Sequence, residues 1–222
     1  ATARAGGERL AAEVASRVVE RVVRWDLTEV RSFNTETLLD VSRVLTALAL
    51  SKPGSASLES LSRDLGISKR GVALILEALE DADVLFRVPP IGPGRRRVRK
   101  AWKAYFTTPT LRWGLCREVG YVWEGESALL LEEAVAGRLR RLAWSRLGAA
   151  LSYGWSDGEV DLILEVERAR VAFEVGVGKG PSVELASRAS RLGADLVYLV
   201  RNRPGVEERG GAIAIPAWVA LF

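Results

Sequence analysis

Two acidic residues in the C-terminal part of the sequence have the type and spacing of metal ligands. Asp161 and Glu174 lie 13 positions apart, each within a short aliphatic run that predicts a strand. If the two strands are neighbours, both side chains point to one face of the sheet at about the same height. Carboxylate oxygens placed in this way can bind a divalent cation, and we expect Mg²⁺ or Mn²⁺. Glu132, from a long predicted helix, could join them.

The surroundings of these carboxylates leave two interpretations open. Their neighbours along the chain are aliphatic, and burying an unpaired carboxylate among such residues is costly. That cost favours a functional site. The alternative is that each carboxylate pairs with one of the 27 arginines of the chain.

Missing residue types narrow the chemistry further. The chain has no histidine and a single cysteine, Cys116. This excludes Ser-His-Asp triads, Cys-His dyads, histidine zinc sites and an internal disulfide framework. The glycine-rich run at residues 176–180 lacks the spacing and the Ser/Thr of a GxxxxGK[ST] phosphate loop. We therefore expect no ATP binding by that mechanism.

The positive charge of the chain is concentrated in one segment. Residues 87–117 carry nine basic and no acidic side chains, whereas the whole chain of 222 residues has a formal net charge of +4. A compact basic cluster is typical of a surface that binds a polyanion such as DNA. The alternative is a solvated face whose charge is balanced by acids elsewhere in the fold.

A helix-turn-helix pattern precedes this basic segment. Residues 58–65 and 69–82 predict two short helices, with a turn at residues 66–68 between them. A predicted strand at residues 84–88, a Pro/Gly turn and a return strand at residues 95–100 complete a winged helix. Such a fold serves either DNA or a protein partner, and the basic segment favours DNA. The expected DNA contacts are Ser68, Lys69, Arg70, Arg95, Arg96, Arg97, Arg99, Lys100 and Lys103.

The remaining elements predict an α+β or α/β chain. A long helix is expected at residues 127–147, followed by strands that form a mixed sheet with one further helix. We expect four segments: an N-terminal helical segment (1–34), the winged helix (35–106), a linker (107–126) and the α/β domain (127–222).

Several motifs in this order resemble one protein family. Residues 158–164 and 173–175 resemble the core of the PD-(D/E)xK nuclease-like fold, and residues 131–135 resemble its first-helix motif. Residues 105–112 and 215–218 are similar to the C-terminal region of archaeal and bacterial AAA+ family P-loop ATPases. The resemblance runs from Leu38 to Phe222. It implies a winged helix followed by a restriction-endonuclease-like domain, with an ATPase domain upstream as a partner.

The resemblance also implies a set of catalytic residues, with one departure. The family motif ends in Glu-x-Lys, but Gly176 occupies the lysine position and Lys179 follows three residues later. Val160 also replaces the motif proline. The implied catalytic residues are Glu132, Asp161, Glu174 and Lys179.

Three functions follow from these patterns. We expect a DNA-binding module of an ATPase-type protein with a degenerate nuclease-like domain. A metal-dependent DNA endonuclease and a protein-interaction or self-association module are the alternatives. No apolar run is long enough to span a membrane, so we expect a cytoplasmic protein without a membrane partner.

Overall composition bears on the source of the protein. Met and Gln are absent and Asn occurs twice, which fits the depletion of thermolabile residues in a thermophile. A GC-rich genome is the alternative explanation. With the family resemblance, this composition leads us to expect an archaeal thermophile. Since Met is absent, a trimmed initiator and a fragment of a longer protein both stay open.

Overall fold

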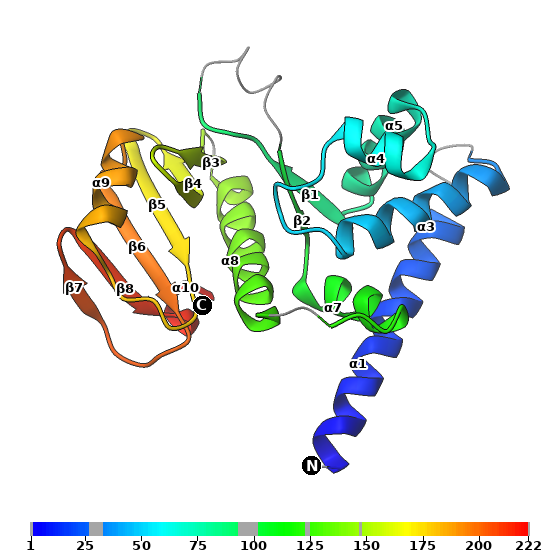
Figure 1. The fold of residues 1–222 in the computed structure, drawn as a ribbon, viewed down its shortest axis with the longest axis horizontal. Helices are drawn as coiled ribbons and strands as arrows, with labels where there is room; N and C mark the ends of the chain where they lie inside the picture. Colours follow the sequence, from blue (N-terminus) through cyan, green and yellow to red (C-terminus); the bar gives the residue numbers. More distant parts are fainter. Residues whose placement is uncertain (1, 27–32, 93–101, 123–124, 147, 222) are drawn as a thin grey trace. The chain divides into compact units, whose positions relative to one another are not determined.

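A computed structural model describes residues 2–26, 33–92, 102–122, 125–146 and 148–221 of the chain. It has a mixed α+β fold, in which helices come first and a six-stranded mixed sheet with interspersed helices follows (Figure 1). The chain divides into two units, which we describe separately. A helical unit comprises Ala1–Arg87 and Ala101–Glu124, and a sheet unit comprises Val88–Lys100 and Gly125–Phe222.

The helical unit has one hydrophobic core. Its helices are α1 (Thr2–Arg21), the π-helical turn η1 (Val22–Asp26), α3 (Thr35–Ala49), α4 (Leu58–Leu65), α5 (Lys69–Asp81) and α7 (Pro109–Glu118). Buried residues of α1, α3, α4, α5 and α7 all belong to one cluster. Close approach of α1 and α7 depends on Gly114, where an added Cβ would lie 2.4 Å from the Cβ of Ala15. The helices of the predicted segments 1–34 and 35–106 therefore share one core with α7, which lies in the predicted linker.

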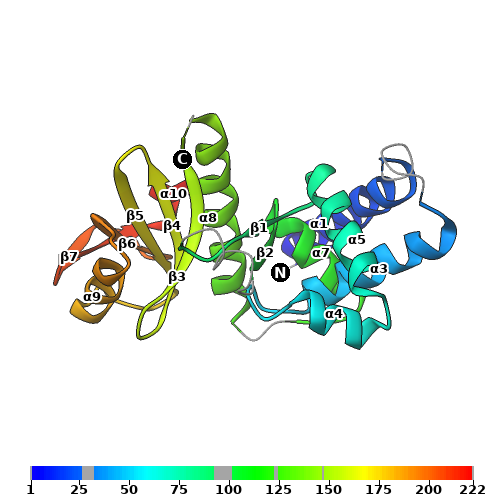
Figure 2. The same ribbon diagram turned by 90° about the horizontal axis from the view of Figure 1, so that it is seen from above.

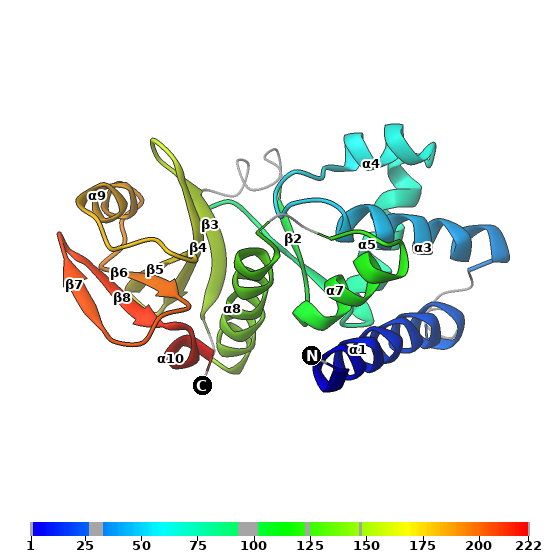
Figure 3. The ribbon, with the colours of Figure 1, turned by 60° about the horizontal axis from the view of Figure 1, so that its bottom comes forward.

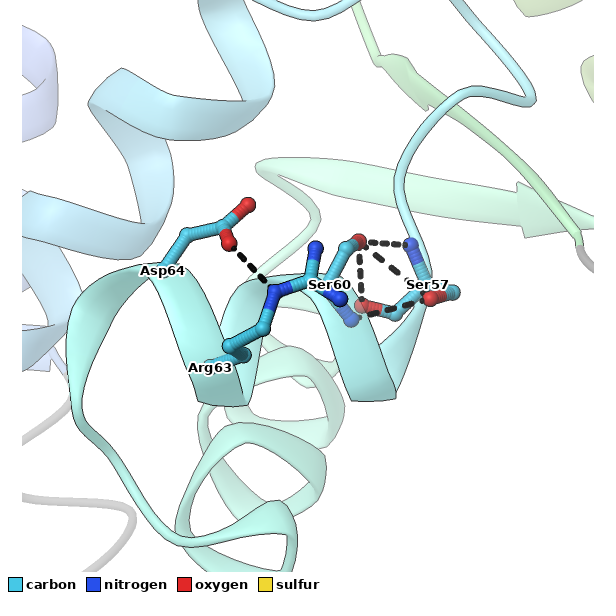
Figure 4. A network of polar contacts seen from close by, with 4 residues as sticks. All are labelled: Ser57, Ser60, Arg63 and Asp64. Carbon is cyan, nitrogen blue, oxygen red and sulfur yellow. Dashed lines mark hydrogen bonds and ion pairs between the residues drawn. The ribbon is translucent and has the colours of Figure 1, made fainter.

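Local hydrogen bonds define the ends of α4 and α5. Ser57 and Ser60 form a capping box, in which each side chain accepts a hydrogen bond from the other residue's backbone N–H (Figure 4). Gly66 ends α4 with a φ of 69°, a left-handed conformation that glycine adopts without steric cost. Ser68 then caps α5. The two helices are thus joined by the tight turn that the sequence predicts.

A two-stranded sheet follows α5. Strands β1 (Leu85–Val88) and β2 (Lys103–Phe106) form it. The return strand was expected at residues 95–100, which lie outside the described residues. The described strand that pairs with β1 begins at Lys103.

The sheet unit is built on six strands in the order β3-β4-β5-β6-β8-β7. Neighbouring strands are antiparallel except for the parallel pairs β5–β6 and β6–β8. Helix α9 (Val183–Arg191) lies on one face of the sheet, while α8 (Glu126–Ser145) and α10 (Ala217–Leu221) lie on the other (Figures 2 and 3). The strands are β3 (Ala150–Trp155), β4 (Glu159–Val166), β5 (Ala169–Val175), β6 (Leu196–Arg201), β7 (Glu207–Arg209) and β8 (Ala212–Pro216). The exposed strand β7 lacks an apolar pattern and was not predicted.

A short segment from the middle of the chain covers the β3 edge. The backbone N–H of Tyr153 donates to Pro89 O at 3.0 Å, and the N–H of Ile91 donates to Tyr153 O at 2.7 Å. Ile91 also packs against the core between the sheet and α9. Edge strands covered in this way are protected from pairing with other chains.

Candidate active site

Asp161 and Glu174 come together at the centre of the sheet unit. Strand β4 pairs with β5 so that Leu162 opposes Phe173, and Asp161 and Glu174 are the next residues of the two strands beyond this pair. Glu174 is two residues after Ala172, which belongs to the core under α9, so its side chain points to the α9 face. The carboxylate of Asp161 accepts a hydrogen bond from the backbone N–H of Val175 at 2.9 Å. The structure therefore brings the two carboxylates close enough for the charge of Asp161 to act on Glu174.

A β-bulge lies beside this pair. Ser152 pairs with Ile163 and Gly154 with Val160, so both Asp161 and Leu162 stand opposite the single residue Tyr153. Bulges of this kind re-aim a side chain and are common next to active sites. Asp161 is one of the two residues in the bulge, so the bulge influences the direction of its side chain.

Glu174 is a buried acid with an unsatisfied oxygen. The residue is 7% exposed, and its Oε2 atom is buried without a hydrogen-bond partner. Burial raises the pKa of its carboxyl group, and the nearby charge of Asp161 raises it further. Lys179 and Arg188 act in the opposite direction. An orphaned buried oxygen next to a second carboxylate suits a cation that is not part of the protein.

Lys179 reaches back to this pair across Gly176. Its Nζ atom donates to Oε1 of Glu174 at 3.1 Å. A Cβ added at Gly176 would lie 2.6 Å from Cδ of Lys179 and 3.0 Å from its Cγ. The stem of Lys179 therefore occupies the space that a side chain at position 176 would use. The absence of a side chain at Gly176 and the lysine three residues later are thus parts of one arrangement.

Arg188 of α9 is a site residue that the sequence did not single out. Its Nη1 atom donates to the backbone oxygen of Glu159 at 3.0 Å, and its charge opposes the raised pKa of Glu174. The available signal was its position one turn after Leu185 and beside Ala189, both buried against the sheet. A basic residue at the edge of an apolar helix face could have been marked as a candidate.

Glu132 does not complete a three-carboxylate set. It belongs to α8, which lies on the opposite face of the sheet from α9 (Figure 2). Within the described ranges, no three Asp, Glu, Cys or His residues are grouped as metal ligands. The remaining pair, Asp161 and Glu174, still fits a magnesium-type ion, because such ions are held by one or two carboxylates and keep several waters.

The predicted DNA contacts have different environments. Ser68, Lys69 and Arg70 are exposed at the start of α5, where the hydroxyl of Ser68 accepts from Gly71 N at 3.0 Å. Lys69 donates to Glu59 at 2.9 Å, and this ion pair lowers the pKa of Glu59. Arg95, Arg96, Arg97, Arg99 and Lys100 lie outside the described residues.

The predicted DNA contact at Lys103 is wrong. It is only 1% exposed on β2, and its stem contacts the turn at Gly54. An ammonium group buried in this way is not available to a phosphate, so Lys103 does not belong to the DNA-contacting set.

The part of the chain that the structure describes holds no helix long and apolar enough to cross a membrane.

The fold and the site define a mixed α+β protein whose sheet carries a carboxylate–lysine centre. The chain belongs to the family described as Domain of unknown function (DUF8612), whose model matches residues 2–115. It is 31% identical over 201 residues to the uncharacterized protein MJ1637 of Methanocaldococcus jannaschii, an archaeal thermophile. That alignment covers 90% of this chain and 42% of the relative, so the chain spans less than half of the relative's length. No solved structure matches the chain.

Proposed function

We propose that this protein binds DNA and that its sheet unit hydrolyses phosphodiester bonds with a divalent metal ion. The observation that carries the proposal is the convergence of Asp161, Glu174 and Lys179 on one face of the sheet. Two carboxylates on adjacent strands followed by a lysine are the residues that the PD-(D/E)xK nuclease-like fold uses. Here Lys179 reaches the acidic pair from a position three residues later than in that motif.

Each residue has a distinct part in this chemistry. Asp161 and Glu174 would hold Mg²⁺ or Mn²⁺ through their oxygens, including the buried Oε2 of Glu174. When bound, the metal polarises the phosphate and lowers the pKa of a water molecule. The ammonium group of Lys179 orients that water and stabilises negative charge that develops on the phosphate. Arg188 adds positive charge near Glu174, which favours the approach of a polyanion.

The helical unit supplies the proposed DNA-binding element. Helices α3, α4 and α5 followed by strands β1 and β2 appear in the order of a winged helix. Lys69 and Arg70 are exposed at the start of α5, the end of a recognition helix that contacts DNA. The basic segment that follows would bind backbone phosphates and make affinity strongly dependent on salt. An ATPase domain elsewhere in the protein is compatible with the greater length of the archaeal relative.

A second candidate function is DNA binding without cleavage. Gly176 stands where the family motif has its lysine, and Glu132 lies on the other face of the sheet from α9. Either departure is sufficient to reduce hydrolysis, since a metal-activated water works best with an oriented partner.

Cleavage of linear, single-stranded and branched DNA with Mg²⁺ or Mn²⁺ decides between the two. We expect cleavage by the wild-type protein and none by Asp161→Ala. Glu165→Gln is the matched control, because Glu165 lies on the same strand but pairs with Arg170 at 2.9 Å. Metal should also raise the melting temperature of the wild type and not that of Asp161→Ala. DNA binding without cleavage or metal stabilisation would support the second candidate.

DNA binding itself is tested by charge reversal. Arg70→Glu, and separately the reversal of Arg95, Arg96 and Arg97, should weaken duplex binding for all sequences alike and flatten its salt dependence. Arg63→Glu, on the preceding helix, serves as a control of the same charge change. Binding at full strength in both charge-reversed proteins would refute the DNA-binding proposal.

A further inference from the structure

The second half of α8 is a basic segment outside the carboxylate centre. Between Glu133 and Asp157 the sequence contains four arginines and no acidic residue. They are Arg138, Arg140, Arg141 and Arg146. Three of them lie within the helix and the fourth is its C-terminal cap residue.

An exposed tryptophan lies among these arginines. Trp144 is 69% exposed, although an indole ring is usually largely buried. The guanidinium carbon of Arg140, one turn earlier, lies 3.8 Å from the centroid of the ring. This contact covers part of the ring and holds it in place, while the large exposed area leaves it accessible from solvent. The result is an aromatic surface that is both oriented and open.

Two further arginines lie near Trp144 at the end of the helix. Arg141 precedes Trp144 by three positions and therefore lies beside it on the helix. Arg146 is the C-terminal cap residue two positions after Trp144, where the backbone is extended. Both are exposed. Strand β3 after the helix adds no acid, and Glu165, which pairs with the first residue of β3, is held by Arg170. The second half of α8 and the strand that follows it therefore bring four arginines and no acidic residue to the chain around Trp144.

Helix stability alone does not explain this arrangement. Basic residues in the last turn of a helix interact favourably with the helix dipole, but the last turn of α8 contains none. Nor does the dipole account for an exposed indole among the arginines of this helix. Trp218 on α10 is similarly exposed, at 64%, but its helix carries no charged residue. Trp144 is thus distinguished from another exposed tryptophan by its cationic surroundings.

We propose that Trp144, Arg141 and Arg146 form a binding site for single-stranded nucleic acid. A base stacks on the exposed indole, while the two arginines bind the flanking phosphates. Stacking on an aromatic ring tolerates any base, so the site selects unpaired strands and not a sequence. The site needs neither the carboxylate centre nor α5, and it therefore goes beyond the function proposed above.

Binding of labelled oligothymidylate and oligouridylate to the full chain, measured by fluorescence anisotropy, tests this site. Trp144→Ala should weaken binding of both strands about tenfold, the effect expected for one lost stacking contact. Trp144→Phe should retain most of the affinity. Arg141→Glu should reduce affinity and lower the slope of affinity against salt. Trp218→Ala is the matched control and should bind as the wild type does.

The outcomes separate this proposal from the function proposed above. Full single-strand affinity in Trp144→Ala, or an equal loss in Trp218→Ala, would overturn the site. The site would also be overturned if the wild-type protein bound and cleaved duplex DNA but did not bind single strands. The proposed function would stand in that case. If the wild-type protein binds single strands through Trp144 but neither binds nor cleaves duplex DNA, the result supports the site and refutes the proposed function. Circular dichroism confirms that each variant is folded, and Trp144→Phe and Arg141→Glu keep the test valid if Trp144→Ala is unstable.

Discussion

At the residue scale, the carboxylate centre is electrostatically unfavourable without a cation. Glu174 is buried beside Asp161, and its Oε2 atom has no hydrogen-bond partner. Lys179 offsets part of this cost, but its side chain is largely exposed, so the attraction is screened by water. Functional sites commonly carry such costs, which the rest of the fold must support.

Glu174→Gln should stabilise the metal-free protein, increasingly so as the pH rises. Because the pKa of Glu174 is raised by folding, the folded chain holds this proton to higher pH than the unfolded chain does. The wild type therefore loses stability as the pH increases from about 4.5 through the raised pKa. Glutamine has no such loss, and a gain of about 0.5–2 kcal/mol at neutral pH is expected. Urea unfolding at several pH values, with a chelator present, measures it. A pH-independent difference would contradict the argument.

Gly176→Ala should reduce cleavage about as much as Lys179→Ala does. The new methyl group would occupy the space of the Lys179 stem and move its ammonium group from Glu174. A loss of about a hundredfold is expected if Lys179 acts on the reacting water. The double variant Gly176→Lys/Lys179→Ala returns the lysine to the motif position and should recover activity. Single-turnover cleavage rates compare the four proteins, and a wild-type rate in Lys179→Ala would show that Lys179 has no such part.

At the element scale, the C-terminus of α3 is held by a buried arginine. Nη1 of Arg112 on α7 donates to the backbone oxygens of Leu48, Ala49 and Ser51 at 2.9, 3.0 and 2.8 Å. The guanidinium carbon lies 5.1 Å from the centroid of the Phe106 ring, and the residue is 1% exposed. A cation at the end of a helix satisfies carbonyl groups that have no partner within the helix. Helix α7 is thereby fixed to α3.

Arg112→Met should lower the free energy of unfolding by about 3 kcal/mol or more. The substitution leaves buried carbonyl groups without a charged donor, and each hydrogen bond to a charged group contributes about 1.5–3 kcal/mol. Denaturant unfolding monitored by circular dichroism measures the change. Arg63→Met is the control, since Arg63 pairs with Asp64 at the surface and such pairs contribute little (Figure 4). Equal losses in the two variants would contradict this account of Arg112.

At the scale of the whole molecule, each of the two units is built from two separate stretches of the chain. Val88–Lys100 groups with the sheet unit, although the segments before and after it belong to the helical unit. The hydrogen bonds of Pro89 and Ile91 with Tyr153 show why, since this segment covers the β3 edge. A single cut near residue 125 would therefore separate Val88–Lys100 from the sheet unit to which it belongs.

The isolated fragment Gly125–Phe222 should be less stable than the same residues in the full chain. It lacks two backbone hydrogen bonds to Tyr153 and the contact of Ile91 with the core. These account for about 2–4 kcal/mol, and their loss exposes an edge strand that promotes association. Thermal unfolding and light scattering test both effects. Adding residues 1–124 in trans should restore stability if the covering segment is the cause, and a fragment as stable as the full chain would contradict it.

The sequence by itself determined the α4–α5 turn and the strands that carry the acidic pair. The pattern of residues 57–68, with serine caps and a left-handed glycine, specifies the α4–α5 turn through local hydrogen bonds alone. The alternation of apolar residues around Asp161 and Glu174 likewise predicts neighbouring strands, and a β-hairpin register then brings the two acids together. Local propensity and short-range pairing are sufficient for these features.

Only the tertiary structure decided which charged residues remain at the surface and which reach the site. Lys103 and Arg112 count toward the basic segment of the sequence, yet both are buried because β2 and α7 pack against the rest of the helical unit. Arg188 comes to the carboxylate centre because α9 crosses the sheet, and Glu132 does not because α8 covers the other face. Charge and spacing specify what a side chain can do, but long-range packing determines its neighbours.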